Sequence, residues 1–109
     1  MFREVAILTL SAGLAATAAA KDAKVAHGEK VYAAQKCALC HSIGDKGNKK
    51  GALDDVGSKL KGDEIREWIV DSKGMTGKTK ATRKPVMKVY SLPKEDVEAL
   101  AAYLMTLKK

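Results

Sequence analysis

The chain has 109 residues, with 20 Lys and Arg against 13 Asp and Glu, so its formal net charge is +7. This length allows one small domain and excludes an arrangement of several domains. Because it contains only one Trp, one Phe and three Tyr, the chain buries little apolar surface by itself.

The first twenty residues have the pattern of a secretory signal peptide. Arg3 gives a positive start, residues 5–16 form an apolar run, and the alanines at 18–20 suit a cleavage site. The run is shorter than the roughly 20 residues that span a bilayer, which argues against an uncleaved anchor. The sequence therefore predicts a signal peptide over 1–20 and one exported domain over 21–109, without stable membrane insertion.

The exported domain begins with a helical pattern over residues 24–37. Val25, Tyr32 and Ala33 form its apolar stripe, and Gly28 marks a place of close approach. We expect this helix to deliver the next residues at its C-terminal end.

Those residues include Cys37 and Cys40, the only cysteines, and His41, which follows them directly. This spacing is typical of covalent haem attachment, in which two thiols bind the porphyrin vinyl groups and the histidine ligates the iron. A disulfide, a redox dithiol and half of a zinc site are the alternatives. Zinc would need a second ligand pair, but His27 is the only other histidine, and a thioredoxin-like dithiol would need an α/β surround rather than helical patterns.

Farther along, the glycine-rich, basic stretch 44–51 predicts a loop without regular structure. Asp63 and Glu64 suit the positive end of a helix dipole and begin a short helix. Its apolar side chains fall at i, i+3 and i+4: Ile65, Trp68 and Ile69.

The polar, basic stretch 73–86 contains two glycines and Pro85, and it predicts a long surface loop. Pro93 suits the first turn of a last helix. The apolar face of that helix consists of Val97, Leu100, Ala101, Leu104 and Leu107. No internal repeat and no strand-like alternation interrupts these patterns, so the sequence predicts an all-α fold.

Together these features resemble a class I c-type cytochrome, a small single-haem electron carrier of the bacterial periplasm. The resemblance covers essentially all of the exported domain. It rests on Gly28 and Tyr32, the haem motif, the stretch 53–58, the helix with Trp68, a late methionine and the closing stretch 98–104.

The resemblance implies a cytochrome c fold, with about three to five short helices and long loops wrapped around one covalently bound haem c. It also implies that the first and last helices cross, with Gly28 and Tyr32 meeting Leu100 and Tyr103.

The family's second axial ligand is a methionine sulfur, for which the exported domain offers Met75, Met87 and Met105. Met87 matches the family's ligand segment in its spacing to Tyr90 and the last helix, and it is the predicted ligand beside His41. Met75 lies in the basic loop without apolar support, and Met105 suits an ordinary role in the last helix. The family usually has proline directly after this methionine, whereas Lys88 follows here.

Three further expectations concern the surroundings of the iron. In the family, the proximal histidine donates to a backbone carbonyl, usually of a proline, and counting back from Leu53 gives Gly51 or Ala52 here. Trp68 lies either against the haem or in the core. His27 is expected to be a solvated side chain.

The resemblance implies an electron carrier rather than an enzyme, because filled axial positions leave no site for oxygen chemistry. The alternative is a five-coordinate haem protein with ligand-binding or peroxidase-like activity, should Met87 not bind. We expect a monomer that meets acidic redox partners and no nucleic acid. The basic side chains that would surround the haem edge are Lys46, Lys49, Lys50, Lys73, Lys78, Lys80, Arg83, Lys84 and Lys88.

Overall fold

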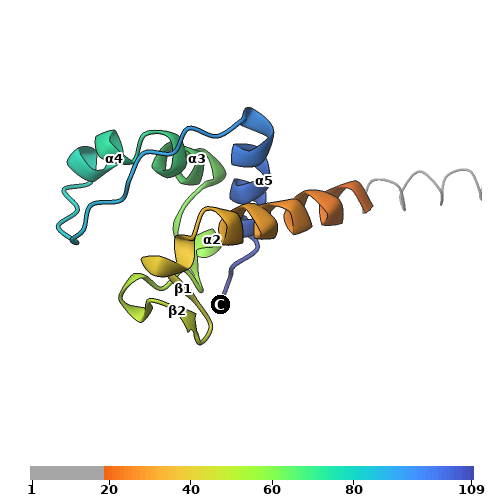
Figure 1. The fold of residues 1–109 in the computed structure, drawn as a ribbon, viewed down its shortest axis with the longest axis horizontal. Coiled ribbons are helices and arrows are strands. Elements are labelled where there is room, and N and C mark those ends of the chain that lie inside the picture. Colours follow the sequence, from red (N-terminus) through yellow and green to blue (C-terminus); the bar gives the residue numbers. More distant parts are fainter. Residues whose placement is uncertain (1–18) are drawn as a thin grey trace, which may run out of the picture.

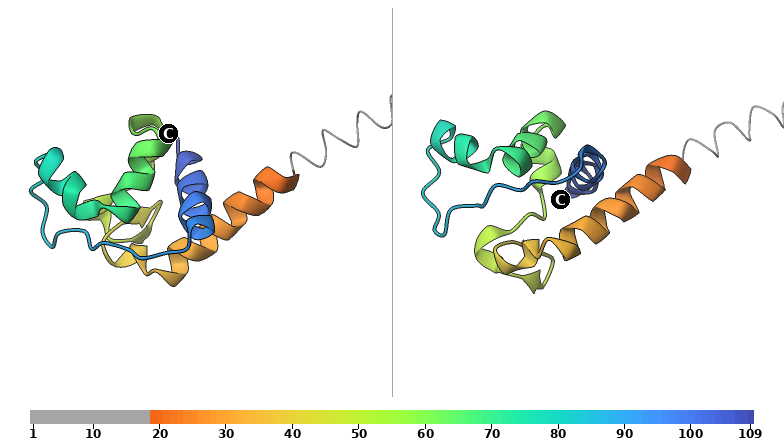
Figure 2. Two further views of the ribbon diagram at one scale, coloured as in Figure 1. Left: turned by 90° about the horizontal axis from the view of Figure 1, so that it is seen from above. Right: turned by 45° about the horizontal axis from the view of Figure 1, so that its top comes forward.

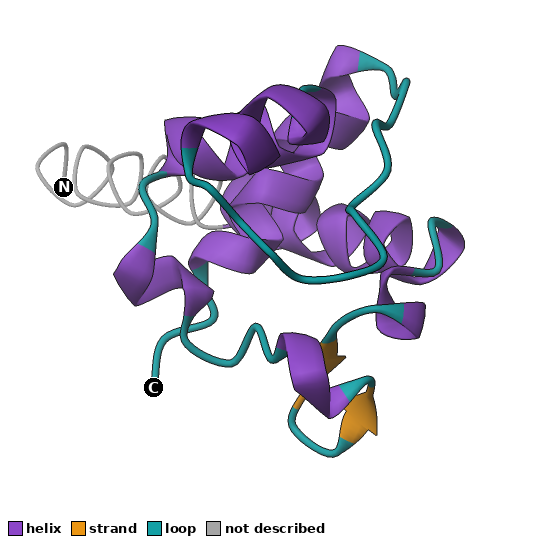
Figure 3. Ribbon diagram, turned by 90° about the vertical axis from the view of Figure 1, so that its left-hand side faces the viewer, coloured by secondary structure: helices purple, strands orange, loops and turns teal. Residues whose placement is uncertain are grey.

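The structure is a computed structural model that describes residues 19–109. Five α-helices make up most of this part of the chain, and the two strands found in it form one small hairpin (Figures 1 and 3). The elements are a helix over 19–34, η1 (Cys37–Leu39), β1 (Ser42–Ile43), β2 (Lys46–Gly47), η2 (Lys49–Gly51), α2 (Val56–Lys59), α3 (Gly62–Val70), α4 (Ser72–Lys78) and α5 (Lys94–Met105). The predicted fold of short helices is confirmed.

The helix over 19–34 crosses α5, as Figures 1 and 2 show. Gly28 is buried at the crossing, where a Cβ would overlap the Ala99 backbone and lie 2.7 Å from the Cβ of Tyr103. The rings of Tyr32 and Tyr103 meet edge to face, with centroids 5.9 Å apart. The predicted crossing is therefore confirmed, although Ala99 rather than Leu100 supplies the backbone nearest to Gly28.

The core lies among the first helix, α3 and α5. Ala33, which the sequence placed in the apolar stripe, is exposed, so that prediction is wrong. Val31 is buried instead, because Gly28, Val31 and Tyr32 fall at i, i+3 and i+4 on one face of the helix. The buried cluster consists of Val31, Ile65, Ile69, Val97, Leu100, Ala101 and Leu104.

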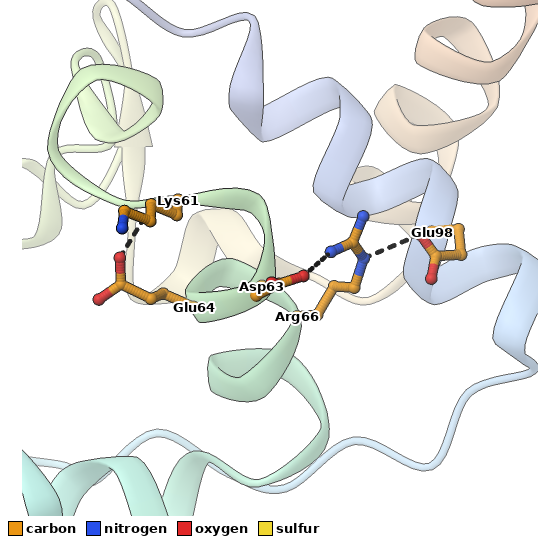
Figure 4. Close-up of polar contacts among 5 residues, drawn as sticks. All are labelled: Lys61, Asp63, Glu64, Arg66 and Glu98. Carbon is orange, nitrogen blue, oxygen red and sulfur yellow. Dashed lines mark hydrogen bonds and ion pairs between the residues drawn. The ribbon is translucent and has the colours of Figure 1, made fainter.

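The helix predicted from Asp63 and Glu64 is α3. The Glu64 carboxylate accepts a hydrogen bond from the Lys61 N–H at 3.0 Å, which satisfies one free donor at the helix start (Figure 4). Arg66 donates to Asp63 at 2.6 Å and, through Nε, to Glu98 of α5 at 2.8 Å. Such partly exposed pairs contribute about 0.2–1 kcal/mol each. The pair with Glu98 therefore helps to orient α3 on α5, while apolar burial supplies most of the stabilisation.

Helix α4 corrects the prediction of a surface loop over 73–86. The Asp71 side chain accepts from the Gly74 N–H at 3.2 Å, and the Thr76 hydroxyl donates to the Ser72 carbonyl at 2.7 Å. These local bonds cap and support one short helix despite its two glycines. From 79 to 93 the chain has neither helix nor strand, so the loop begins later than predicted.

The stretch 44–51 also has more structure than predicted. Strands β1 and β2 pair Ser42 with Gly47 and Ile43 with Lys46, and η2 follows. The Asn48 N–H lies 3.1 Å from the Ala38 carbonyl and 2.9 Å from the His41 carbonyl. The stretch is ordered because it folds back onto the cysteine segment, a long-range contact that its composition does not reveal.

Residues 1–18 of the predicted signal peptide lie outside the described part of the chain, and its last two alanines are helical and exposed. Within residues 19–109, none of the helices has the length and apolar character needed to cross a membrane.

Candidate functional site

The segment with the two cysteines is a tight turn at the end of the first helix. The helix ends at residue 34 rather than at Cys37 as predicted, because Lys36 adopts a left-handed φ of 56°. The N–H groups of Cys40 and His41 both donate to the Cys37 carbonyl, at 3.1 and 2.9 Å. The turn therefore holds His41 beside two free, partly buried thiols.

The imidazole of His41 is fixed by a backbone carbonyl. Its Nδ1 lies 2.9 Å from the Gly51 oxygen, which confirms Gly51 over Ala52 as the acceptor. Burial lowers the pKa of His41, the Gly51 carbonyl opposes this change, and the Arg83 guanidinium lowers the pKa further. The ring is therefore neutral, with the hydrogen on Nδ1 and the Nε2 lone pair available to a metal.

The segment that carries Met87 is fixed at two points. Ser72, whose side chain is fully buried, donates its hydroxyl hydrogen to the Met87 carbonyl at 3.0 Å. The Tyr90 N–H donates to the Ile69 carbonyl at 3.3 Å. Met87 itself is half-buried, so its thioether is not locked within the core of the polypeptide.

The segment that carries Met87 is also linked to the turn that carries the cysteines. Burial raises the pKa of the Cys37 thiol, and the Lys88 ammonium partly offsets this rise. Burial also raises the pKa of Tyr90, and charge on Cys37 and Cys40 would raise it further. A direct contact joins the two segments, because the Arg83 guanidinium, four residues before Met87, donates to the Cys40 carbonyl at 2.6 Å.

Met75 differs from its predicted setting. It belongs to α4 rather than to a loop, and only 5% of its surface is exposed, so the prediction that it lies in a surface loop is wrong. Its N–H and carbonyl are both engaged in helical hydrogen bonds, to Asp71 and from Thr79. Met105 ends α5 and packs against the core, as expected of an ordinary apolar residue.

The hydroxyl of Tyr32 is an orphaned polar atom. It is buried without a hydrogen-bond partner among the described residues, and burial raises the pKa of Tyr32 to about 12. Cys37 is close enough to contribute to that rise. A buried hydroxyl without a partner costs free energy, so this atom fits a site that receives a polar group from a bound molecule or water.

The donors in this region fit a covalent haem. Two free thiols, a neutral imidazole with Nε2 available and a nearby thioether are the groups that this cofactor uses. Among residues 19–109 no three His, Cys, Asp or Glu side chains gather as they would around a metal ion, so the zinc alternative gains no further ligands there.

Two other predicted residues are placed as follows. Trp68 is half-buried on α3. His27 is not simply solvated, as predicted, because its Nε2 lies 2.8 Å from Asp96 of α5. This contact joins the crossing helices and keeps His27 away from any ligand role.

Sequence reasoning missed two residues that position the site, Ser72 and Arg83. Ser72 carries no pattern that distinguishes it from a loop serine. Arg83 was grouped with the surface charges, but it donates to the Cys40 carbonyl at 2.6 Å. The only sequence signal that could have indicated its role is its position four residues before the predicted ligand Met87.

Comparison with known proteins identifies the family of nearly all of the described part of the chain. A protein-family model described as Cytochrome c matches residues 25–108. Neither the curated proteins nor the solved structures include a match to the chain.

Proposed function

Because the chain belongs to the cytochrome c family and so carries a covalently bound haem c, we propose that it is a periplasmic carrier of single electrons. The thiols of Cys37 and Cys40 attach the haem, and His41 and Met87 are its axial ligands. Haem-based electron transfer follows from the family, and the residues and the compartment are our assignment.

The hydrogen bond from His41 Nδ1 to the Gly51 carbonyl carries this assignment. It holds the ring in the tautomer that leaves Nε2 free, and it increases the basicity of that nitrogen. The two thiols lie on the same tight turn. No other described histidine is placed this way, since His27 is engaged with Asp96.

Met87 is supported as the second ligand by its neighbourhood. Arg83, four residues earlier on the same segment, donates to the Cys40 carbonyl at 2.6 Å. The buried Ser72 hydroxyl fixes the Met87 backbone, whereas Met75 is enclosed within α4. A tethered, half-buried thioether near the attachment turn is better placed to reach the iron.

When bound, the haem supplies a one-electron iron couple. His41 and Met87 would hold the iron through an imidazole nitrogen and a thioether, and a thioether ligand would favour its reduced state. The surrounding apolar side chains exclude water, which keeps reorganisation small. Because both axial positions are filled, the arrangement supports a carrier rather than an enzyme.

Redox proteins are the partners that the family implies, and we propose that they present acidic docking surfaces to a monomer of this chain. Eight lysines of the predicted rim are exposed, whereas Arg83 turns inward. Exposed lysines attract an acidic partner over about 10 Å at moderate salt and so raise the encounter rate. The exposed members of the rim are Lys46, Lys49, Lys50, Lys73, Lys78, Lys80, Lys84 and Lys88.

Export to the periplasm is supported by the first twenty residues. Arg3, the apolar run over 5–16 and the alanines at 18–20 form the three parts of a signal peptide. N-terminal sequencing of the protein recovered from periplasm should give Lys21 as the first residue. A protein that keeps its first twenty residues would contradict this part of the proposal.

The ligand assignment is tested with Met87→Ala and, as a matched control, Met75→Ala. Met87→Ala should remove the weak long-wavelength absorption band of an iron–thioether bond, lower the midpoint potential and let cyanide bind the oxidised protein quickly. Met75→Ala should leave all three properties nearly unchanged, although it lowers stability by about 2–5 kcal/mol as a buried truncation.

If Met75→Ala has the larger spectral effect, Met75 is the ligand and the assignment of Met87 is wrong. If the unaltered protein lacks the thioether band and binds cyanide at once, the iron has an open position. The chain would then be a ligand-binding or peroxidase-like haem protein instead of a carrier.

A further inference from the structure

Arg83 is the one member of the basic group that the structure turns inward. Its Nη2 donates to the Cys40 carbonyl at 2.6 Å, and the residue is only partly exposed. A hydrogen bond from a guanidinium to a neutral acceptor is stronger than one between neutral groups. The segment between α4 and Met87 is therefore attached directly to the turn that carries both cysteines.

Gly51 provides the space that Arg83 occupies. A Cβ at residue 51 would overlap Nη1 of Arg83 and the Cys40 carbonyl. In the family that the chain resembles, a proline usually supplies the carbonyl that Gly51 supplies here. Gly51 thus has two roles at this side of the site. Its carbonyl accepts the hydrogen bond from His41, and its lack of a side chain leaves space for the guanidinium.

The guanidinium also brings a positive charge to the haem-attachment turn. Its Nη2 donates to the carbonyl of Cys40, the residue directly before His41. An arginine stays protonated at every pH at which the protein folds, so this charge is permanent. An oxidised iron carries one more positive charge than a reduced one, and a nearby fixed cation disfavours the oxidised state.

We propose that Arg83 is a positioning residue that clamps the Met87 segment to the haem-attachment turn and, by its fixed charge, favours the reduced iron. The inference rests on the proposed function for the haem site at Cys37, Cys40 and His41. The clamp has two ends, since Ser72 holds the Met87 carbonyl and Arg83 holds the chain four residues earlier. Reduction of the bound iron would take one electron from a redox partner, and Arg83 would keep its proton and its charge throughout.

The test uses Arg83→Gln, with Lys84→Gln as the matched control that removes the same charge from an exposed neighbour. The midpoint potential and the rate of cyanide binding to the oxidised protein are measured on the haem-loaded protein. Arg83→Gln should lower the midpoint potential, which corresponds to an equilibrium constant for reduction about threefold to tenfold smaller. A tenfold change corresponds to 59 mV for one electron. Arg83→Gln should also speed cyanide binding about tenfold, because one end of the clamp is lost.

Lys84→Gln should change the equilibrium constant for reduction and the rate of cyanide binding by less than about twofold each, since the charge of Lys84 lies in water. Arg83→Lys separates the two roles. Arg83→Lys should keep the equilibrium constant for reduction within about twofold of its original value, because the positive charge remains. It should still bind cyanide faster, because an ammonium group cannot reproduce the planar donor geometry of a guanidinium. If Arg83→Gln yields too little folded protein, the Lys variant alone still tests the proposal through this split.

The inference is overturned if Arg83→Gln matches Lys84→Gln in potential, or if Arg83→Lys lowers the potential as far as Arg83→Gln does. Failure of the Met87 assignment has a different signature. In that case the unaltered protein already lacks the thioether band and binds cyanide quickly, whereas Arg83→Gln still lowers the potential.

Discussion

Replacing Gly28 with alanine tests the crossing of the first helix and α5. The added Cβ would overlap the Ala99 backbone and lie 2.7 Å from the Cβ of Tyr103. Neither group is the end of a flexible side chain, so the helices must separate. Overpacking of this kind costs about 1–3 kcal/mol, occasionally more.

A second effect opposes that cost. Alanine favours a helix interior over glycine by about 0.8–1.0 kcal/mol. Because the Cβ would overlap backbone atoms, we expect the upper part of the cost range, about 2–3 kcal/mol. The expected net loss for Gly28→Ala is then roughly 1–2 kcal/mol, which corresponds to a melting temperature lower by about 4–16 °C for a domain of this size. Thermal and urea unfolding of the haem-loaded protein, followed by circular dichroism, measure this loss.

Gly77→Ala is the matched control. Gly77 also lies in a helix, α4, but a Cβ there meets nothing within 4 Å. Its effect should be neutral or stabilising by up to about 1 kcal/mol. If Gly28→Ala is as stable as the original protein, the two helices move apart without cost and the close contact does not determine their packing.

Three further changes test other parts of the molecule. Replacing both Cys37 and Cys40 with alanine should abolish covalent haem on a denaturing gel and leave a largely unfolded chain by circular dichroism, because the cofactor completes the core. Lys80→Glu with Lys84→Glu should slow electron transfer to an acidic partner about tenfold at low salt, measured by stopped flow, and have little effect at high salt. Burial raises the pKa of Tyr32 to about 12, so the contribution of its neutral hydroxyl to stability is complete below pH 10 and is lost between about pH 10 and 12. The free energy of unfolding of Tyr32→Phe should therefore fall less across that range than that of the original protein.

Each of these changes has a defined contrary outcome. Haem staining that survives the loss of both thiols would contradict covalent attachment. The charge-matched control for the rim is Lys24→Glu with Lys94→Glu, near the starts of the crossing helices, and an equal slowing by that pair would show that net charge rather than the rim steers encounter. An alkaline stability profile that Tyr32→Phe leaves unaltered would show that other groups cause the fall.

The sequence alone predicted the main helices and supports the proposed attachment residues. Cys37, Cys40 and His41 lie within five positions of one another, so their spacing suggests a haem motif before any folding is considered. Helices α3 and α5 were predictable because their apolar side chains repeat with the helical period and acidic residues begin each one. These are local features, and local features can be read from sequence.

The tertiary structure decided the features that depend on distant partners. Helix α4 looked like a loop because its two glycines oppose a helix and its sequence is polar and basic. Its local caps and the burial of Met75 outweigh the glycines. His27 and Asp96 lie 69 residues apart in sequence, and Arg83 and Cys40 lie 43 apart, so no periodicity relates them. Whether a charged side chain is solvated or bound depends on which backbone groups the fold brings to it, and for Arg83 that was the space left by Gly51.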